Sequence, residues 1–411
     1  MNRSAPAPAL PPLFAMEIFS GLSRGAFLVA IGWNTLVITN EVSRVGQVFI
    51  VSMLTVLLLG PFMGTVVDRQ DRRNLVILAH GGLAAVLMGL GLFWVGNATP
   101  GLGWLFLAVA AASGLRAIHN MAHDGLIQRA VDASRLVQTV ARFRTVHLAS
   151  TALGTMATGY VINRYGPAAG FYSSAAASLM LIVPMVFVPR QRPGAPPSAR
   201  PGFWTDLQAG LALFHGSQTL RRLALLAAVS LPIGQLSNAI LSSLIRDDLL
   251  LGSDAFGIVD AAWPIGGMLG ALVLSLGIRK LSALGAEYLF ALLAGLMTIG
   301  LSFGEVVPLL FILHGGMGLA VWLCRIIIDS RVLQLCTADT VGRTKAGLEM
   351  MFCLSALVMC LSPSLISLPE TASYFLFWGC LMVGISGFFW WRAQEFSMPS
   401  SCRMTSASCS P

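Results

Sequence analysis

The sequence predicts an all-α membrane protein with twelve transmembrane helices in two pseudo-symmetric halves of six helices each. The chain of 411 residues is 56% hydrophobic and only 11% charged, and its mean hydropathy is +0.77. Such a composition leaves too few polar residues for the wetted surface of a soluble domain. The apolar residues also occur in runs of about 20 or more, long enough to cross a bilayer as helices.

The apolar runs fall into two sets of six, separated by the Pro- and Arg-rich stretch PRQRPGAPPSARPGFW at 189–204. We expect spans at 16–40, 45–66, 74–96, 103–127, 136–162, 167–188, 221–246, 255–277, 281–302, 306–330, 344–367 and 371–392. The predicted organisation is a tail (1–15), a first half (16–188), a central loop (189–220), a second half (221–392) and a second tail (393–411).

The two halves resemble each other at widely separated positions. GPFMG at 60–64 has a counterpart in GGMLG at 266–270, and the Arg72-Arg73 pair has one in Arg279-Lys280. These offsets of 206 and 207 residues are nearly equal, which indicates an internal duplication. Transporters are commonly built from such repeats, with the substrate site between them near the middle of the membrane.

The positions of Lys and Arg predict the orientation of the chain. Eighteen of the 26 fall on the side that holds both termini, and only Arg44, Arg164 and Arg246 fall on the other. Lys and Arg are retained in the cytoplasm, so both termini are predicted to be cytoplasmic. This bias accounts for the net charge of +8. No basic tract with interleaved aromatic residues supports nucleic-acid binding.

Metal and cofactor sites are not expected. All seven cysteines come after residue 320, and none forms a CxxC pair. In lipid or in a reducing cytosol such cysteines favour neither disulfides nor zinc. We expect no metal and no cofactor.

The segment GPFMGTVVDRQDRR at 60–73 places five charged residues among the six from Asp68 to Arg73. It resembles the signature loop between the second and third helices of the major facilitator superfamily. The residues that match that signature are Gly64, Asp68, Arg69, Arg72 and Arg73. Asp71 stands where the signature usually has Gly, which resembles the branch of the enterobactin exporter and related efflux proteins. FWTDLQAGLALFHGSQTLRR at 203–222 also resembles that branch.

The resemblance implies a loop that latches the two halves together on the cytoplasmic face. Its arginines then need acidic partners, for which Asp124 and Glu349 are the candidates. Gly60 and Gly64 are four residues apart and are expected to let another helix approach closely. In the fifth span, GTMATG at 154–159 lacks the Pro of the kink that many exporters of the superfamily carry, which weakens the case for drug/proton antiport.

Candidate binding residues are the polar and charged residues inside the predicted spans, because a charge in the bilayer is costly and is usually functional. In GLRAIHNMAHDG at 114–125, the Arg, both His and the Asn share one helical face. Basic residues outnumber acids in the spans of the first half, which favours anionic cargo. The predicted substrate-binding residues are Arg24, Asn34, Arg116, His119, Asn120, His123, Arg144, Gln235, Asn238, Trp322 and Arg325. Bonding within the helix bundle is the alternative for each, and Arg325 could simply neutralise Asp329.

Proton coupling requires a buried group that changes its protonation state during the cycle. The first half offers four such residues, namely Glu17, His119, His123 and Asp124. Each could instead have a structural role, and no single residue of the four is favoured by the sequence.

The sequence thus predicts a secondary transporter of the bacterial inner membrane that exports a small anionic or amphipathic molecule, such as a siderophore, in exchange for protons. Multidrug efflux and uptake of an anionic metabolite or iron–siderophore are the alternatives. The pattern His119 to Asp124 also resembles a glycerolipid acyltransferase motif, and histidines four apart could hold a metal. An enzyme and a nontransporting sensor are therefore remote alternatives. We expect a monomer whose partners are cargo, protons and lipid.

Overall fold

The structure is a computed structural model, and it describes residues 10–95, 101–131, 133–190, 217–275, 285–336 and 341–397. Within these ranges every regular element is a helix. The helices of the first half are α1 (Leu10–Thr39), α2 (Val42–Arg69), α3 (Arg72–Val95), α4 (Leu102–Ala130), α5 (Ala133–Tyr165) and α6 (Pro167–Val186). The predicted central loop lies largely outside the described residues.

In the second half the first crossing is broken into three pieces. Pro232 interrupts it, because proline cannot supply a backbone donor to a continuing helix, and its last turn is π-helical. The helices of this half are α8 (Gln218–Ser230), α9 (Ile233–Ser243), η1 (Leu244–Asp248), α10 (Ser253–Ser275), α11 (Ala286–Leu301), α12 (Val307–Leu335), α13 (Val341–Leu365) and α14 (Ala372–Ser397).

With α8, α9 and η1 counted as one broken helix, twelve helices cross the bundle within the described ranges. Ten of these crossings are long and apolar enough to span a membrane. The other two are α5, which carries Arg142, Arg144 and His147, and α11, which has only 16 residues. The predicted fold class is confirmed.

Several helices extend beyond the predicted spans. Helix α1 begins at Leu10, inside the predicted tail, with Pro11 and Pro12 in its first turn, where proline does not disturb the hydrogen bonds. Helix α14 continues to Ser397. Helix α11 begins at Ala286, directly after Gly285, which has a left-handed φ of 95°; residues 281–284 of this predicted span lie outside the described residues.

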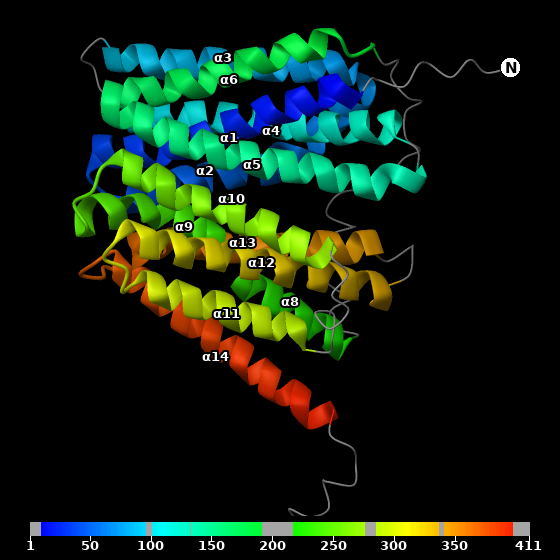
Figure 1. Ribbon diagram of the computed structural model, residues 1–411, viewed down its shortest axis with the longest axis vertical. Helices are drawn as coiled ribbons and strands as arrows, with labels where there is room; N and C mark the ends of the chain where they lie inside the picture. The colour runs from blue at the N-terminus through cyan, green and yellow to red at the C-terminus, as the bar shows by residue number, and fades with distance from the viewer. Residues whose placement is uncertain are drawn as a thin grey trace, which may run out of the picture.

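The six helices of each half lie together, one half above the other in Figure 1. The halves meet where α5 packs on α10 and where α2 packs on α13. Helices α3 and α6 form the outer edge of the first half, and α11 and α14 that of the second. Both described chain ends lie on one side, which we call the terminal face, and we call the other side the opposite face (Figure 1).

Glycines permit the closest helix contacts. A Cβ on Gly154 of α5 would lie 2.5 Å from the carbonyl oxygen of Leu22 in α1. A Cβ on Gly257 of α10 would lie 2.6 Å from the carbonyl oxygen of Thr155 and 2.9 Å from Cα of Gly159, both in α5. The two outer glycines of GTMATG therefore hold α5 against α1 and α10. The expectation for Gly60 was wrong, because no atom lies within 4 Å of its would-be Cβ.

Hydrogen bonds connect the halves at the opposite face. Arg246 of η1 donates to the Leu36 carbonyl at 2.9 Å and to Asn40 Oδ1 at 2.6 Å, both at the end of α1. Asn40 has a φ of 49°, a conformation that asparagine tolerates better than most residues. Ser253 also donates to the Gly159 carbonyl at 3.0 Å. This face is closed between the halves.

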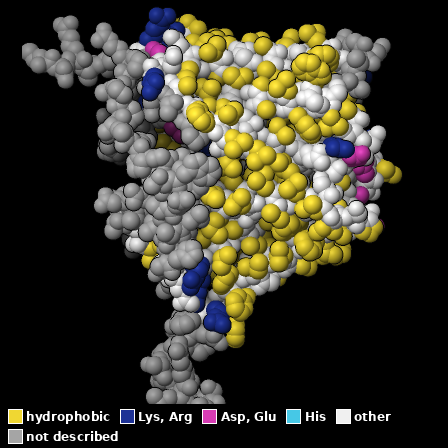
Figure 2. All heavy atoms as spheres, turned by 180° about the vertical axis from the view of Figure 1, so that it is seen from behind, with side chains coloured by type: hydrophobic (Ala, Val, Ile, Leu, Met, Phe, Trp, Pro, Cys, Tyr) yellow, Lys and Arg dark blue, Asp and Glu magenta, His cyan; other side chains and the backbone are white. Residues whose placement is uncertain are grey.

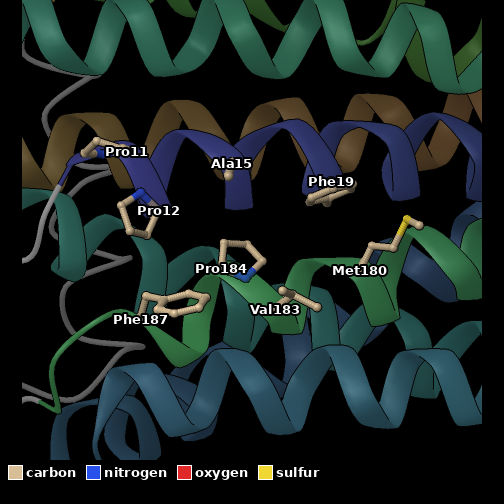
Figure 3. Close-up of a pocket in the computed structure, with 8 residues that line it drawn as sticks. All are labelled: Pro11, Pro12, Ala15, Phe19, Met180, Val183, Pro184 and Phe187. Carbon is tan, nitrogen blue, oxygen red and sulfur yellow. The ribbon is translucent and has the colours of Figure 1, made fainter.

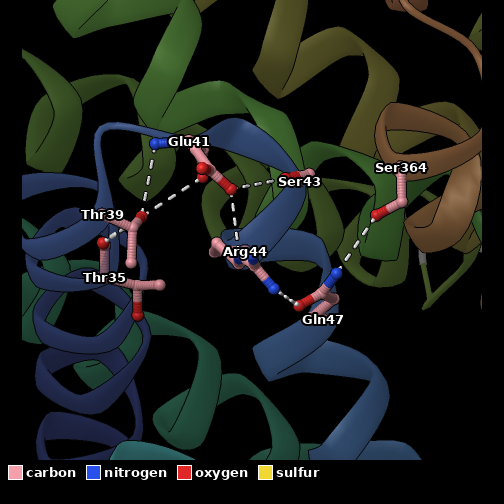
Figure 4. Close-up of polar contacts among 7 residues, drawn as sticks. All are labelled: Thr35, Thr39, Glu41, Ser43, Arg44, Gln47 and Ser364. Atoms are coloured by element: carbon pink, nitrogen blue, oxygen red, sulfur yellow. Dashed lines mark hydrogen bonds and ion pairs between the residues drawn. The ribbon is translucent and has the colours of Figure 1, made fainter. Parts of the chain in front are cut away.

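A second group of contacts at the opposite face surrounds the turn between α1 and α2 (Figure 4). Arg44 bonds Glu41 at 2.9 Å and Gln47 at 3.1 Å, all within the first half. Gln47 reaches across to Ser364 of α13 at 3.5 Å. Figure 2 shows hydrophobic side chains over the middle of the molecule, with charged side chains gathered near its two sides, as expected for a bilayer-spanning protein.

Candidate functional site

The first half encloses a carboxylate between two imidazoles. Glu17 of α1 places Oε2 2.9 Å from Nε2 of His123 in α4 and Oε1 2.9 Å from Nδ1 of His147 in α5. The side chains of Glu17, His123 and His147 are only 7%, 12% and 20% exposed. Three helices are therefore joined through one buried acid. The other nitrogen of His123 faces Asp124 Oδ1 at 3.7 Å, and that carboxylate is 78% exposed.

Two further histidines extend this group toward the middle of the bundle. His119, one turn from His123, stacks on it with ring centroids 5.7 Å apart and bonds Ser20 of α1 at 3.1 Å. His80 of α3 meets the edge of His119 at 4.6 Å. His80 is 1% and His119 4% exposed. We call the five residues Glu17, His80, His119, His123 and His147 the histidine cluster.

Arg116 continues along the same face of α4. Its Nη2 donates to the carbonyl of Ser23 at 3.0 Å and to its hydroxyl at 3.2 Å. The guanidinium also lies over the ring of Phe27 at 4.7 Å. Arg116 therefore has hydrogen-bond partners within the helix bundle, on α1, as the alternative to a cargo-binding role expects. Arg116 is 8% exposed.

Charged side chains from both halves interact electrostatically near Arg116. Arg24 of α1 is within electrostatic range of Arg116, of Arg144 in α5 and of Asp260 in α10. Arg144 also crosses to the second half, where it lies over the ring of Trp322 at 5.2 Å. Asp260 is buried, at 7% exposure. We call Arg24, Arg116, Arg144, Asp260 and Trp322 the central charged site.

Toward the terminal face, the second half has a charged recess of about 170 Å³. Arg325 of α12 donates to Glu349 of α13 at 3.1 Å and lies over Phe352 at 5.8 Å. Lys345 and Asp329 also line the recess. The sequence suggested that Arg325 could simply neutralise Asp329. In the structure Arg325 instead bonds the carboxylate of Glu349 on the neighbouring helix.

The remaining predicted binding residues lie in other surroundings. Asn238 donates to Gln235 at 3.3 Å on α9, and both are half-buried. Asn120 is exposed. Asn34 is fully buried, and its amide donates to the Pro167 carbonyl at 2.9 Å. The amide nitrogen of Asn34 is thus directed at α6, while its amide oxygen is buried with no hydrogen-bond partner among the described residues.

The residues of the predicted latch are only partly described. Helix α2 contains Gly64 and Asp68, whose side chains lie outside the described residues, and Arg69 is exposed. Arg72 lies against Gly125, next to Asp124 in the chain. Arg73 donates to the carbonyls of Met185 and Val186, both at 3.0 Å. Glu349 bonds Arg325 of its own half in this conformation.

An apolar groove lies between the start of α1 and the end of α6 (Figure 3). Its volume is about 560 Å³. The groove is lined entirely by apolar residues, namely Pro11, Pro12, Ala15, Phe19, Met180, Val183, Pro184 and Phe187. It has no polar group that could orient a cargo, so it is not the transport site.

Sequence reasoning missed three buried titratable groups. Asp260 is a lone acid within the apolar run FGIVDAAWP, His80 lies in the third span, and Glu287 lies in the ninth. Glu287 is 5% exposed and faces Arg331 at 3.9 Å. Each could have been found by the rule that intramembrane ionisable residues are functional candidates. In the part of the chain that the structure describes, no group of three or more His, Cys, Asp or Glu has the arrangement of a metal site.

The sequence profile of the Major Facilitator Superfamily matches residues 13–358. Solved structures with this fold include the nucleoside transporter NupG, at 14% identity and a TM-score of 0.74, covering 95% of this chain and 99% of that one. A POT-family peptide transporter in complex with alafosfalin is 14% identical, with a TM-score of 0.75 and 94% coverage of both chains. A bacterial homologue of human Spinster, described as inward-facing and unoccupied, is 12% identical with a TM-score of 0.68, covering 94% of this chain and 96% of that one.

No curated protein sequence matches the chain. The fold and the polar residues buried between its halves define a multi-pass membrane transporter of small molecules, of the secondary-transporter kind, and not an enzyme. The chain belongs to the Major Facilitator Superfamily.

Proposed function

We propose that this protein is a proton-coupled secondary transporter that exports a small anionic or amphipathic molecule across the bacterial inner membrane. A catecholate siderophore is the first candidate cargo. The terminal face is cytoplasmic in this proposal, because eighteen of the 26 Lys and Arg residues are on that side.

The observation that carries the proposal is the excess of positive charge at the central charged site. Arg24, Arg116 and Arg144, from three helices of the first half, are linked by electrostatic interactions, while Asp260 faces Arg24, and Glu17 and Asp124 interact with Arg144. Each guanidinium presents several donors in a planar fork that matches a carboxylate or catecholate. A surplus of cations in a cleft raises the local concentration of anions.

Aromatic rings beside these arginines favour a cargo with an aromatic or apolar part. Phe27 lies under Arg116 and Trp322 lies under Arg144. An arginine held on an aromatic face keeps its edge free to bind an anion, while the ring offers an apolar surface. A catechol has both an anionic edge and a flat ring.

The contacts between the halves support entry of cargo from the terminal face. The opposite face is closed by Arg246, Ser253 and Gln47. Near the terminal face, by contrast, Arg144, Lys345 and Glu349 are exposed on the two halves. This conformation therefore corresponds to the loading state of an exporter.

Transport can be tested in proteoliposomes with labelled 2,3-dihydroxybenzoate, a small catecholate carboxylate, and an imposed pH gradient. We expect gradient-dependent accumulation, and we expect Arg144→Ala to abolish it by removing an anion contact. Because Arg144 is exposed, its replacement should leave the fold intact. Arg164→Ala is the matched control, since Arg164 lies near the opposite face over Tyr165.

Arg116→Ala is expected to abolish transport as well, with insertion and folding retained. Arg116→Lys, which preserves the charge, should restore part of the flux. A deletion strain that secretes its iron chelator at normal levels would refute siderophore export. Accumulation that is insensitive to both arginine substitutions would refute the anion site.

A further inference from the structure

Four of the six histidines of this chain gather in the histidine cluster around one carboxylate. They come from α3, α4 and α5, while Glu17 comes from α1. Such a concentration of titratable groups inside an apolar helix bundle is costly unless their charges compensate each other. The central charged site binds anions through its arginines and leaves the cluster without an assigned role.

We infer that Glu17, His123 and His147 form the proton-binding site of the transporter, and that His119 and His80 connect it with the central charged site. The inference deepens the proposed function and rests on it, because it names the residues that hold the coupled proton. The bridging geometry assigns this role to His147, which the sequence alone did not single out.

The charge balance of the cluster explains why it binds a proton. With both imidazoles neutral, His123 Nε2 and His147 Nδ1 each lie 2.9 Å from a carboxylate oxygen of Glu17, and the group keeps one buried negative charge. A single proton on either ring neutralises the group and preserves both contacts. Because a buried charge is costly even with Arg144 nearby, the cluster takes up one proton from water and later releases one.

The surroundings of the cluster provide a route for that proton. Asp124 is exposed on the terminal side of His123 and lies 3.7 Å from its Nδ1. The other charged groups near Glu17 are Arg144 of α5 and, along the row of rings, Arg116 beside His80. From α1 only Ser20 contacts the row through a hydrogen bond. Protons therefore reach the cluster from the terminal face in this conformation.

Helix α1 links the proton site with the anion site. Glu17 is held by His123 and His147, Ser20 by His119, and Ser23 by Arg116. These three positions follow each other at intervals of three, so they lie on one face of α1. A change in the charge of Glu17 and its two imidazoles therefore changes the contacts that fix α1. These contacts lie about two turns from Ser23, where Arg116 bonds the same helix.

Infrared difference spectroscopy of the reconstituted protein tests the site without any cargo. Spectra taken at about pH 5 and about pH 9 span the titration of imidazole. We expect carboxylate and imidazole bands that Glu17→Gln removes and that His147→Gln and His123→Gln each alter. Glu305→Gln, at an exposed acid on the opposite face, is the matched control and should leave these bands unchanged.

Transport provides the second readout. Glu17→Gln and His147→Gln are expected to lose accumulation of 2,3-dihydroxybenzoate driven by a pH gradient, but to retain exchange of labelled for unlabelled compound. His147→Gln is the milder variant if Glu17→Gln does not fold. An infrared difference spectrum that Glu17→Gln and His147→Gln leave unchanged would overturn the proton site. If the wild-type protein fails to move the catecholate, the proposed cargo is wrong, and the spectra still decide the proton site.

Discussion

Replacement of Arg246 by alanine should open the opposite face. In the structure this side chain reaches from η1 of the second half to the end of α1 in the first, where it bonds the Leu36 carbonyl and Asn40 Oδ1. The carbonyl end of a helix carries partial negative charge, so the guanidinium also compensates the dipole of α1. Both bonds must break when the halves separate at this face.

The size of the effect follows from these two bonds. A hydrogen bond that involves a charged group contributes about 1.5–3 kcal/mol, and partial exposure reduces this. The Arg246 side chain is 28% exposed, so we take about 2 kcal/mol for the pair, which is about 30-fold in the ratio of closed to open states.

Cysteine accessibility measures this ratio. The seven native cysteines are replaced, Asn238→Cys is introduced on α9, and a membrane-impermeant maleimide is added at the opposite face. Arg246→Ala should label about 30-fold faster than the parent. Arg44→Ala is the control, because Arg44 bonds only Glu41 and Gln47 of its own half. Equal labelling rates for the two variants would refute the role of Arg246.

Three further changes test the packing and the central charged site. Gly154→Ala should lower the unfolding temperature in detergent, because its Cβ would meet the backbone of Leu22 and overpacking costs about 1–3 kcal/mol. Gly89→Ala is the control, because open space surrounds Gly89, and it should leave the unfolding temperature unchanged. Asn34→Ala should cost about 0.5–1.5 kcal/mol of stability by removing the bond to the Pro167 carbonyl, with the affinity for 2,3-dihydroxybenzoate unchanged. A loss of affinity at unchanged stability would restore Asn34 to the cargo site. Asp260→Asn should tighten binding of 2,3-dihydroxybenzoate, measured by calorimetry, because it removes a competing negative charge near Arg24. Asp254→Asn, at the start of the same helix, is its control. Weaker binding in Asp260→Asn would contradict competition between Asp260 and the anion.

Much of the fold was predictable because each crossing needs its own run of apolar residues. Even α5 was found, although Arg142, Arg144 and His147 lower its hydropathy, since its remaining residues are apolar over a sufficient length. The break at Pro232 and the π-helical turn at Leu244–Asp248 were not predicted. Both depend on local backbone geometry, which a count of apolar residues does not record.

The site was less predictable, because its partners come from distant helices. The sequence indicated that Glu17 and His123 are unusual, but not that His147 completes their group or that Arg325 bonds Glu349. Asn34 has the same polarity as a binding residue, and only its contact with Pro167 shows a structural use. Polarity inside a span identifies candidates, whereas the rotation of each helix decides which of them meet.

A pivot at the close contact of Gly159 with Gly257 would give α5 two lever arms of unequal length. From this contact α5 continues about 39 Å to Ala133 at the terminal face, but only about 9 Å to Tyr165 at the opposite face, at 1.5 Å per residue. A rigid tilt of about 10° about this point therefore moves the terminal end by about 7 Å and the opposite end by less than about 2 Å. Such unequal lever arms cannot open both faces by the same motion. With such a pivot, release at the opposite face would require a helix to bend, and the break between α8 and α9 at Pro232 is a place where a helix bends at low energetic cost.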